Sequence, residues 1–319
     1  MRRTLSMCIL AVLAAFVVFL ACPPKTEVVK IGYQKTEVYQ HFFAAVGQGY
    51  FKSEGLQVEP VEFASANQMA EALIAGRIDA TGTSAFPVLF SVEQNSPSQF
   101  KLYLVSVLTG ENFPDYVIVK KGSKLASLAD LKGKKLGTYP GSTLLTYAKQ
   151  ILKRFMDPEK DVQIVQLKPE VQLQALETGQ VDAVFALEPI PSLGVTRGVA
   201  QVLEEAPLAK YVMDPMPGNA SAFSARFAKE RPRVAERVKR AMYRGADFVS
   251  AAENAAESKR MIEKWTAMDP GVIDKLRPPK YWKLDEIDKA AVQKLADLLL
   301  AGGALDKAVS TAGVYYTGK

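Results

Sequence analysis

A glycine followed by two hydroxyl residues lies in the segment Tyr139-Pro140-Gly141-Ser142-Thr143, directly before a run with helical periodicity. The first residues of a helix leave backbone N–H groups without intrahelical partners, and the helix dipole adds a partial positive charge there. The segment is therefore predicted to favour an anionic or strongly accepting group of a bound molecule. Ser84 is expected to provide a similar hydroxyl group at a helix start earlier in the chain, where Thr83 or Ser84 is predicted to cap the next helix. The alternative is that each hydroxyl group caps only its own helix.

A carboxylate and several tyrosines supply the other candidate contacts. Glu188 follows an apolar run and precedes Pro189, so its carboxylate can accept hydrogen bonds either from a ligand or from nearby backbone amides. Tyrosine rings can stack on a flat ligand, whereas Phe86 and Phe113 are expected in the core. The candidate binding residues from these loops are Tyr33, Gln34, Tyr39, Ser84, Tyr139, Gly141, Ser142, Thr143 and Glu188.

The side-chain sets that most enzymes and metal sites use are missing from the sequence. His41 is the single histidine, and it is expected on a helix surface or at the mouth of a cleft. No nucleophile motif, phosphate loop or Cys/His ligand set is present, so we predict no catalytic residue, no metal and no cofactor. Asp79 and Asp182 resemble a carboxylate pair, but their matched places beside two short strands favour structural roles.

Two similar units must position these residues. Leu73–Ala80 and Leu176–Ala183 each read as a helix end, a glycine stop and the start of a short apolar strand. Lys30–Tyr33 and Lys135–Thr138 open the two units at nearly the same spacing. The sequence therefore predicts two βαβαβ halves of about 100 residues each. Ligands of such open α/β sheets bind beyond the carboxyl ends of the strands, where the candidate loops lie.

The N-terminal segment, residues 1–22, is predicted to be a lipoprotein signal peptide. Arg2 and Arg3 precede an apolar run from Met7 to Ala21, which is shorter than a membrane span. Phe19-Leu20-Ala21-Cys22 resembles a bacterial lipobox, with Phe19 where leucine is usual, and we predict lipidation of Cys22. The alternative is a plain secretory signal that is cut near Ala21.

Charge and cysteine content exclude other classes of protein. Basic and acidic residues are interspersed along the chain, and the formal net charge of +6 falls by two when the signal peptide is removed. We therefore expect no nucleic-acid partner. Cys22 is the single cysteine that remains, so no disulfide can form within the mature chain. Its stability must come from core burial, and a chain of this length can achieve that as two domains.

Three segments make the chain similar to a known family: Gly49–Leu56, Asp130–Lys135 and the strand that ends in Glu188-Pro189. They resemble the periplasmic substrate-binding proteins of the nitrate/sulfonate/taurine and thiamine-precursor (NMT1/THI5-like) group, over roughly residues 28–305. The resemblance implies a type II periplasmic-binding-protein fold of class α/β. In that fold two domains are joined by two hinge crossings and enclose a ligand cleft.

The crossings are expected near Asn112–Tyr116 and within Pro207–Gly218. Domain I is then formed by residues 28–114 and 216–319, and domain II by residues 115–215. The resemblance also adds Asn67 and Asn219 to the candidate binding residues. One relative in the group is a pyrimidine synthase that uses histidines and a Cys-rich motif, which this sequence lacks.

The function that the resemblance implies is that of an extracytoplasmic solute-binding lipoprotein that delivers a small organic solute to the permease of an ABC importer. Lys35 is the single basic residue of the candidate loops, so we expect a solute with both acceptor and donor groups, a pyrimidine-type vitamin precursor or a sulfonate such as taurine. Alternatives are an enzyme acting on a small heteroaromatic in the same cleft and a solute-sensing lipoprotein without a transport role. We expect a monomer, lipid-anchored in the cell envelope and facing the periplasm or the cell exterior.

Overall fold

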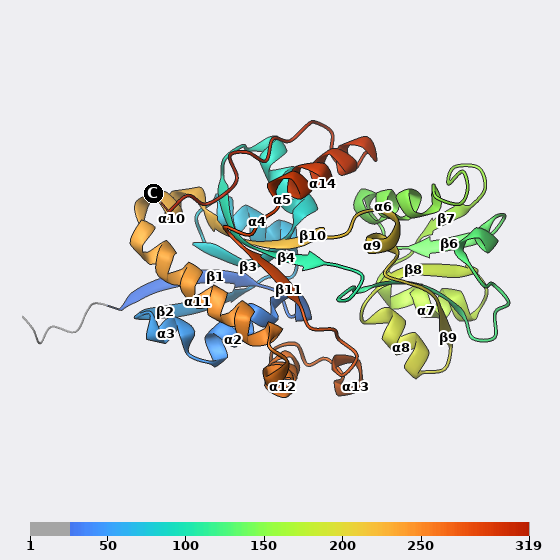
Figure 1. Cartoon of the computed structure of the whole chain (residues 1–319), viewed down its shortest axis with the longest axis horizontal. Helices are drawn as coiled ribbons and strands as arrows, with labels where there is room; N and C mark the ends of the chain where they lie inside the picture. Colours follow the sequence, from blue (N-terminus) through green and yellow to red (C-terminus); the bar gives the residue numbers. More distant parts are fainter. Residues whose placement is uncertain (1–25, 319) are drawn as a thin grey trace, which may run out of the picture.

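Two α/β lobes lie side by side in the computed structural model, which describes residues 26–318 (Figure 1). The predicted signal peptide and Cys22 lie outside the described residues. The first lobe contains a six-stranded sheet and the second lobe a five-stranded sheet. No helix among residues 26–318 combines the length and the apolar composition that a membrane span requires.

The sheet of the first lobe has the strand order β11-β4-β10-β3-β1-β2. Strands β1, β2 and β3 are parallel, and β10 runs antiparallel between β3 and β4. The bounds are β1 Glu27–Tyr33, β2 Leu56–Glu62, β3 Ala80–Ala85, β4 Phe100–Leu108, β10 Met216–Ser224 and β11 Lys280–Lys283.

Helices cover both faces of this sheet (Figure 1). They are η1 Glu37–Tyr39, α2 Gln40–Gly47, α3 Tyr50–Ser53, α4 Ala66–Ile74, α5 Phe86–Asn95, α10 Ala225–Glu230, α11 Pro232–Ser250, η3 Ala252–Asn254, α12 Ala255–Thr266, α13 Pro270–Ile273 and α14 Lys289–Ala301. Helix α11 packs so closely on α2 that a Cβ atom on Gly245 would lie 2.2 Å from the backbone oxygen of His41. The contact therefore requires glycine at position 245.

The sheet of the second lobe has the order β7-β6-β8-β5-β9. Its elements are β5 Asp115–Lys120, η2 Leu128–Leu131, β6 Lys135–Thr138, α6 Ser142–Leu152, β7 Gln163–Gln166, α7 Pro169–Glu177, β8 Ala183–Leu187, α8 Ile190–Thr196, β9 Ala200–Glu205 and α9 Pro207–Tyr211. Strand β6 pairs in parallel with β7 and β8, as β1 does with β2 and β3. This confirms the internal repeat that the sequence predicted.

The main errors of the sequence prediction concern β10 and its neighbour β3. Residues 216–224 were not predicted as a strand, but β10 begins at Met216, inside the expected crossing Pro207–Gly218. Pro217 is tolerated because it precedes the part of β10 that pairs on both sides. Thr83 and Ser84 lie inside β3, and α5 follows Ala85 without a side-chain cap. Ser84 therefore does not cap a helix, and this prediction was wrong.

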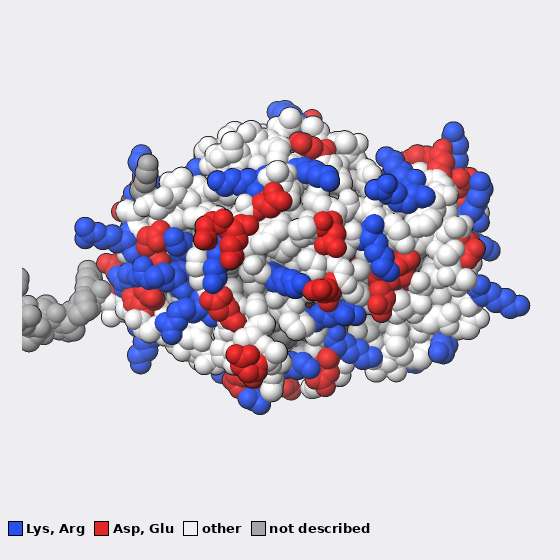
Figure 2. Space-filling view, viewed as in Figure 1, with Lys and Arg blue, Asp and Glu red and all other residues white. Residues whose placement is uncertain are grey.

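The chain passes between the two sheets after β4 and again before β10 (Figure 1). The carboxyl ends of β1, β3, β6 and β8 approach the space between the lobes. On the face shown in Figure 2, basic and acidic residues are interspersed over both lobes. Ligands of open α/β sheets bind beyond such strand ends.

Candidate ligand-binding cleft

A cavity of about 310 Å³ opens between the two lobes. Its wall combines residues from η1, from the ends of β3 and β8, from the start of α6, from β10 and from residues 275–281. Leu144, Tyr147, Leu187 and Phe113 are among the apolar residues of the wall. A volume of this size suits a small molecule and is at the lower end of ordinary ligand sites.

Glu188 lies on the cleft wall directly after β8. Its Oε1 accepts a hydrogen bond from the Ser192 hydroxyl at 2.8 Å, and its Oε2 accepts one from the Ser192 N–H at 3.3 Å. Burial raises the pKa of Glu188, although the bonds from Ser192 and the charges of Lys275 and Arg277 act in the opposite direction. The Glu188 carboxylate thus accepts hydrogen bonds from the start of α8. It also has further lone pairs, which can accept hydrogen bonds from a ligand in the cleft.

A second carboxylate, that of Glu37, reaches the cleft from the first lobe. Burial raises the pKa of Glu37, its own backbone N–H lowers it, and the negative charge of Glu188 raises it further. The two carboxylates thus come from opposite lobes and lie within each other's electrostatic field. A positively charged or N–H donor group between them would relieve this repulsion.

Basic residues also line the cleft: Lys275 and Arg277 from the segment that joins α13 to β11, and Lys280 at the start of β11. The Arg277 guanidinium lies over the ring of Phe113, 4.2 Å from the ring centroid. Lys280 forms an ion pair with Glu111. Lys35, the single basic residue of the candidate loops, pairs with Glu62 at 2.9 Å and is not on the wall. The cations of the wall come from residues 275–280, outside the candidate loops, and the sequence did not indicate them.

Of the predicted binding residues, Thr143, Glu188 and Asn219 are on the cleft wall. Gly141 and Ser142 directly precede Thr143 and are exposed, and the Gly141 N–H donates to Gln166 Oε1 at 2.8 Å. The Tyr139 hydroxyl donates to the Leu187 oxygen at 3.2 Å. Burial raises the pKa of Tyr139 to about 12, while that bond lowers it and the charges of Glu37 and Glu188 raise it.

The other predicted binding residues are not on this wall. Tyr33 and Tyr39 are buried in the first lobe, where both rings lie near Phe43. Gln34 binds the Ala64 oxygen and the Tyr39 hydroxyl. Asn67 is exposed in the first turn of α4, and Ser84 is buried in β3 with no partner for its hydroxyl among residues 26–318. The ligand contacts of all these residues stay predictions.

His41 is buried rather than on a surface or at the cleft mouth, with an exposed fraction of 1%. That expectation was wrong because α11 covers α2 at this point. In the part of the chain that the structure describes, no group of three or more His, Cys, Asp or Glu residues is arranged to hold a metal ion.

The model of the NMT1-like family matches residues 22–263. A curated protein of Escherichia coli (strain K12), named "Putative aliphatic sulfonates-binding protein", is 26% identical over 213 residues, which cover 64% of this chain and 63% of that protein. The matched part is thus less than two thirds of the length of that relative.

Solved structures share the fold over most of the chain. The periplasmic aliphatic sulphonate binding protein SsuA from E. coli aligns with a TM-score of 0.76 at 21% identity and covers 91% of this chain and 92% of that one. A mutant of the enzyme DSZB in complex with biphenyl-2-sulfinic acid aligns with a TM-score of 0.68 at 14% identity, over 91% and 96% of the two chains. The predicted periplasmic-binding-protein fold is confirmed, and the second likeness shows that this fold also occurs in an enzyme.

Proposed function

Because the chain belongs to the NMT1-like family, we propose that it is an extracytoplasmic protein that captures a small organic solute between its lobes and delivers it to an ABC importer. The observation that carries this proposal is the interlobe cavity of about 310 Å³, which has carboxylates from both lobes and cations from residues 275–280 on its wall. The name of the E. coli relative, a sulfonate-binding protein, supports the same class of function.

The charges of the cleft favour a solute that carries both an anionic and a donor group. Lys275 and Arg277 would face a sulfonate, while Glu37 and Glu188 would accept hydrogen bonds from an ammonium or hydroxyl group. Phe113 and Leu187 would cover a short carbon chain between these ends. We therefore place an amino-substituted aliphatic sulfonate first and a pyrimidine-type vitamin precursor second, which reverses the order that the sequence favoured.

Delivery would use the two crossings between the sheets. With domain I at residues 28–114 and 216–319 and domain II at residues 115–215, the segments near 112–116 and 212–217 would act as hinges that let the domains close on the solute. A monomer held at the membrane by a lipid on Cys22 would then present the closed form to the permease.

Calorimetry of the purified mature chain tests the proposal. Taurine, ethanesulfonate, a pyrimidine and nitrate are titrated separately, and mass spectrometry identifies any solute that co-purifies. We expect micromolar or tighter binding of taurine or a close analogue, and recovery of the solute unchanged. Tight binding of nitrate alone would overturn the ligand class. Conversion of the solute during incubation would instead support an enzyme, as in the case of DSZB, which has the same fold.

A further inference from the structure

His41, the single histidine of the chain, forms hydrogen bonds on both sides of its ring. Its Nε2 lies 2.9 Å from the Gly82 carbonyl oxygen and 3.2 Å from Ser221 Oγ. Its Nδ1 lies 3.2 Å from the hydroxyl of Tyr281. The imidazole thus connects the backbone of β3, at Gly82, with a side chain of β11.

The Gly82 carbonyl decides which nitrogen of His41 carries the proton. A carbonyl oxygen only accepts hydrogen bonds, so the nitrogen 2.9 Å from it must be the N–H donor. The Ser221 hydroxyl donates to the same oxygen at 2.6 Å and leaves this assignment unchanged. Burial lowers the pKa of His41 to about 4, although the bond to Gly82 opposes that change, so the ring is neutral near pH 7. Neutral His41 is therefore the Nε2–H tautomer, and its Nδ1 is an acceptor.

Tyr281 must then donate its hydroxyl proton to His41. Nδ1 offers only a lone pair, and the Tyr281 hydroxyl is the group within hydrogen-bond distance of it. The tyrosine is on β11, paired with Ser106 of β4, and both residues line the cleft. Its ring centroid lies 5.0 Å from that of His41. With its proton turned toward His41, the Tyr281 oxygen has only lone pairs left for other partners.

We propose that Tyr281 is a specificity-determining residue of the cleft, held by His41 and the Gly82 carbonyl as a hydrogen-bond acceptor for the solute. This inference rests on the proposed solute-binding function and adds to it a contact outside the candidate loops. Tyr281 favours a ligand that presents an N–H or O–H group at this wall. It disfavours one that presents a sulfonate oxygen there, because two acceptors would then face each other without a proton.

The tautomer is testable without any ligand. Because the chain has one histidine, selective ¹⁵N labelling of histidine produces the signals of a single imidazole. We expect the Nε2–H tautomer at pH 7 and no protonation of the ring as the pH falls to about 5. An Nδ1–H tautomer, or a ring that is cationic near neutral pH, would overturn the inference. Replacement of Tyr281 by Phe should shift the Nδ1 signal because that nitrogen loses its donor.

The role of Tyr281 in binding is tested by calorimetry with a matched pair of solutes, taurine and ethanesulfonate, which differ by the amino group. Tyr281→Phe keeps the ring, and we expect it to weaken taurine binding about tenfold and to leave ethanesulfonate binding unchanged. Tyr50→Phe is the control, since Tyr50 lies in the same lobe and outside the cleft wall. Equal affinities of Tyr281→Phe and wild type for taurine would overturn the inference.

Failure of this inference is distinguishable from failure of the proposed function. If the wild-type chain binds no solute of the panel, the solute-binding proposal fails in an experiment that involves no variant. If the wild type binds taurine and Tyr281→Phe binds it equally well, the solute-binding proposal stands and the role of Tyr281 is wrong. His41→Phe provides a second variant, expected to reduce the preference for taurine over ethanesulfonate because the Tyr281 proton becomes free to turn toward the cleft.

Discussion

Asp79 and Asp182 make the same pair of hydrogen bonds in the two lobes. Asp79 Oδ2 accepts from the Lys30 N–H at 2.9 Å, and Asp182 Oδ2 accepts from the Lys135 N–H at 2.8 Å. The N–H of each aspartate in turn donates to the carbonyl oxygen of the same lysine at 2.9 Å. Each aspartate thus joins the start of β3 or β8 to the neighbouring strand, which supports the structural role expected from their matched positions.

Loss of the Asp182 carboxylate should therefore reduce stability and leave ligand affinity unchanged. We expect Asp182→Ala to lower the free energy of unfolding by about 1–2 kcal/mol, because the Lys135 N–H loses its acceptor. Asp182→Asn keeps an acceptor oxygen and should lose less. Urea denaturation measures both variants. A loss of solute binding in a fully folded Asp182→Ala protein would contradict the structural role.

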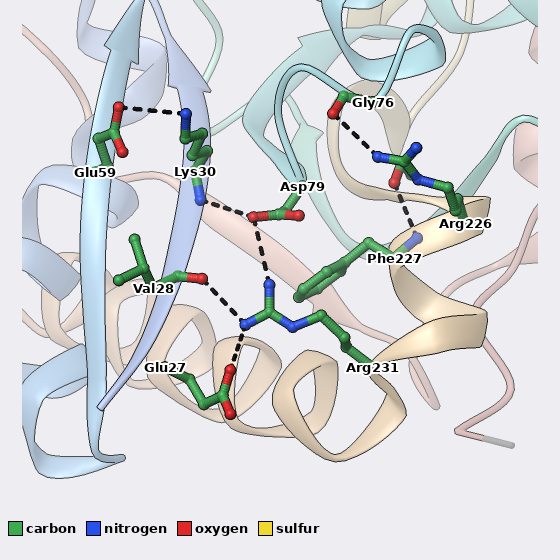
Figure 3. A network of polar contacts seen from close by, with 10 residues as sticks. Glu27, Val28, Lys30, Glu59, Gly76, Asp79, Arg226, Phe227 and Arg231 are labelled. Atoms are coloured by element: carbon green, nitrogen blue, oxygen red, sulfur yellow. Dashed lines mark hydrogen bonds and ion pairs between the residues drawn. The ribbon is translucent and has the colours of Figure 1, made fainter. Parts of the chain in front are cut away.

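Asp79 should tolerate replacement less well than Asp182. Arg231, between α10 and α11, lies 3.9 Å from its carboxylate and also binds Glu27 and the Val28 oxygen, so that β1, the β3 entry and the α10–α11 junction meet at one network (Figure 3). No comparable arginine faces Asp182 among the described residues. The two lobes thus share the pair of aspartate–lysine hydrogen bonds and differ in the residues that surround the aspartate.

Most helices and the parallel strands were predictable because local signals mark them. Ser65 caps α4 through the Gln68 N–H, and Pro87 lies in the first turn of α5, both as expected from sequence. Strand β10 was not predictable, because between Met216 and Phe223 it contains only proline, glycine, asparagine, alanine and serine, which have little β propensity. Its conformation is imposed by hydrogen bonding to β3 and β4 on its two sides.

Apart from Asn219, which the family resemblance indicated, the candidate site was predictable only where it lies near strand ends of the repeat. Glu188 and Thr143 follow β8 and β6, and the rule for open α/β sheets is enough to find them. Arg277 and Lys275 belong to a segment bracketed by prolines, and nothing local indicates that it folds back over the cleft. The sequence does show that two basic residues, Lys275 and Arg277, lie close together between Pro270 and β11, but not where this segment is placed.

Tyrosines at strand ends could not be divided into cleft and core residues from sequence. Tyr33 is the last residue of β1, and Tyr139 directly follows β6, so the two tyrosines lie within one residue of equivalent places. Tyr33 is covered by Trp265 of α12, with ring centroids 5.3 Å apart, whereas Tyr139 remains half-buried beside Leu187. The difference arises from a helix more than 200 residues away, which has no counterpart in the second lobe.

Gly302 is expected to set how closely the two lobes approach. It ends α14 in the first lobe, and its oxygen accepts a hydrogen bond from Thr146 Oγ1 of α6 in the second lobe at 2.9 Å (Figure 1). A Cβ atom on Gly302 would lie 2.1 Å from Thr146 Cγ2. Gly302→Ala should therefore hold the lobes apart, weaken solute binding roughly threefold to tenfold and enlarge the radius of gyration of the solute-bound form.

Gly313→Ala is the matched control for this change, because a Cβ atom there meets no neighbour within 4 Å. Thr146→Ala combined with Gly302→Ala should recover much of the affinity, since the clashing methyl group is removed. Small-angle scattering and calorimetry measure the two effects. An unchanged radius and affinity in Gly302→Ala would show that this contact does not limit closure.

Asp115 and His41 are expected to change the stability of the folded state in opposite directions as the pH falls. Burial raises the pKa of Asp115 to about 6, while the Leu208 N–H bonded to its Oδ2 lowers it. A carboxyl group with a raised native pKa makes the folded state more stable as the pH falls from about 6 to about 4. His41, whose pKa is lowered to about 4, makes the folded state less stable over nearly the same range. The two contributions should nearly cancel in the wild type.

Asp115→Asn should expose the contribution of His41. Relative to wild type, the variant is expected to lose on the order of 3 kcal/mol of unfolding free energy between pH 6.5 and pH 4, as two pKa units imply. Urea unfolding across this range measures the difference. Asp182→Asn, which changes a carboxylate that also accepts one backbone N–H, is the control. A constant offset between Asp115→Asn and wild type would contradict the raised pKa of Asp115.

Cys22 is predicted to carry the lipid anchor, although it lies outside the described residues. Cys22→Ala should abolish labelling by a radioactive or alkyne fatty acid and release the chain from the membrane fraction. A single acyl chain anchors a protein only marginally, so stable retention requires more than one. Cys8→Ala is the control, because Cys8 belongs to the predicted signal peptide. Labelling that persists in Cys22→Ala would disprove the prediction.

Glu188 is predicted to bind the donor end of the solute, and Arg277 the anionic end. Glu188→Ala should weaken taurine binding tenfold to a hundredfold, about 1–3 kcal/mol, because a buried donor loses its acceptor. Ethanesulfonate, which lacks the amino group, should be nearly unaffected. Arg277→Ala should weaken both ligands, and Lys35→Ala neither, since Lys35 pairs with Glu62 away from the wall.

The bond from Ser192 allows the structural role of Glu188 to be separated from binding. Ser192→Ala removes the hydroxyl that donates to Glu188 Oε1 at 2.8 Å and leaves the carboxylate in the cleft. If Glu188 serves mainly α8, Ser192→Ala and Glu188→Ala should lower the unfolding free energy alike, and neither should change taurine affinity. If Glu188 binds the solute, only Glu188→Ala should lose affinity, and Glu188→Gln should fall between it and wild type because the amide oxygen still accepts but carries no charge. Tight nitrate binding that is indifferent to Glu188 would exclude this solute class, because nitrate has no donor for a carboxylate to accept.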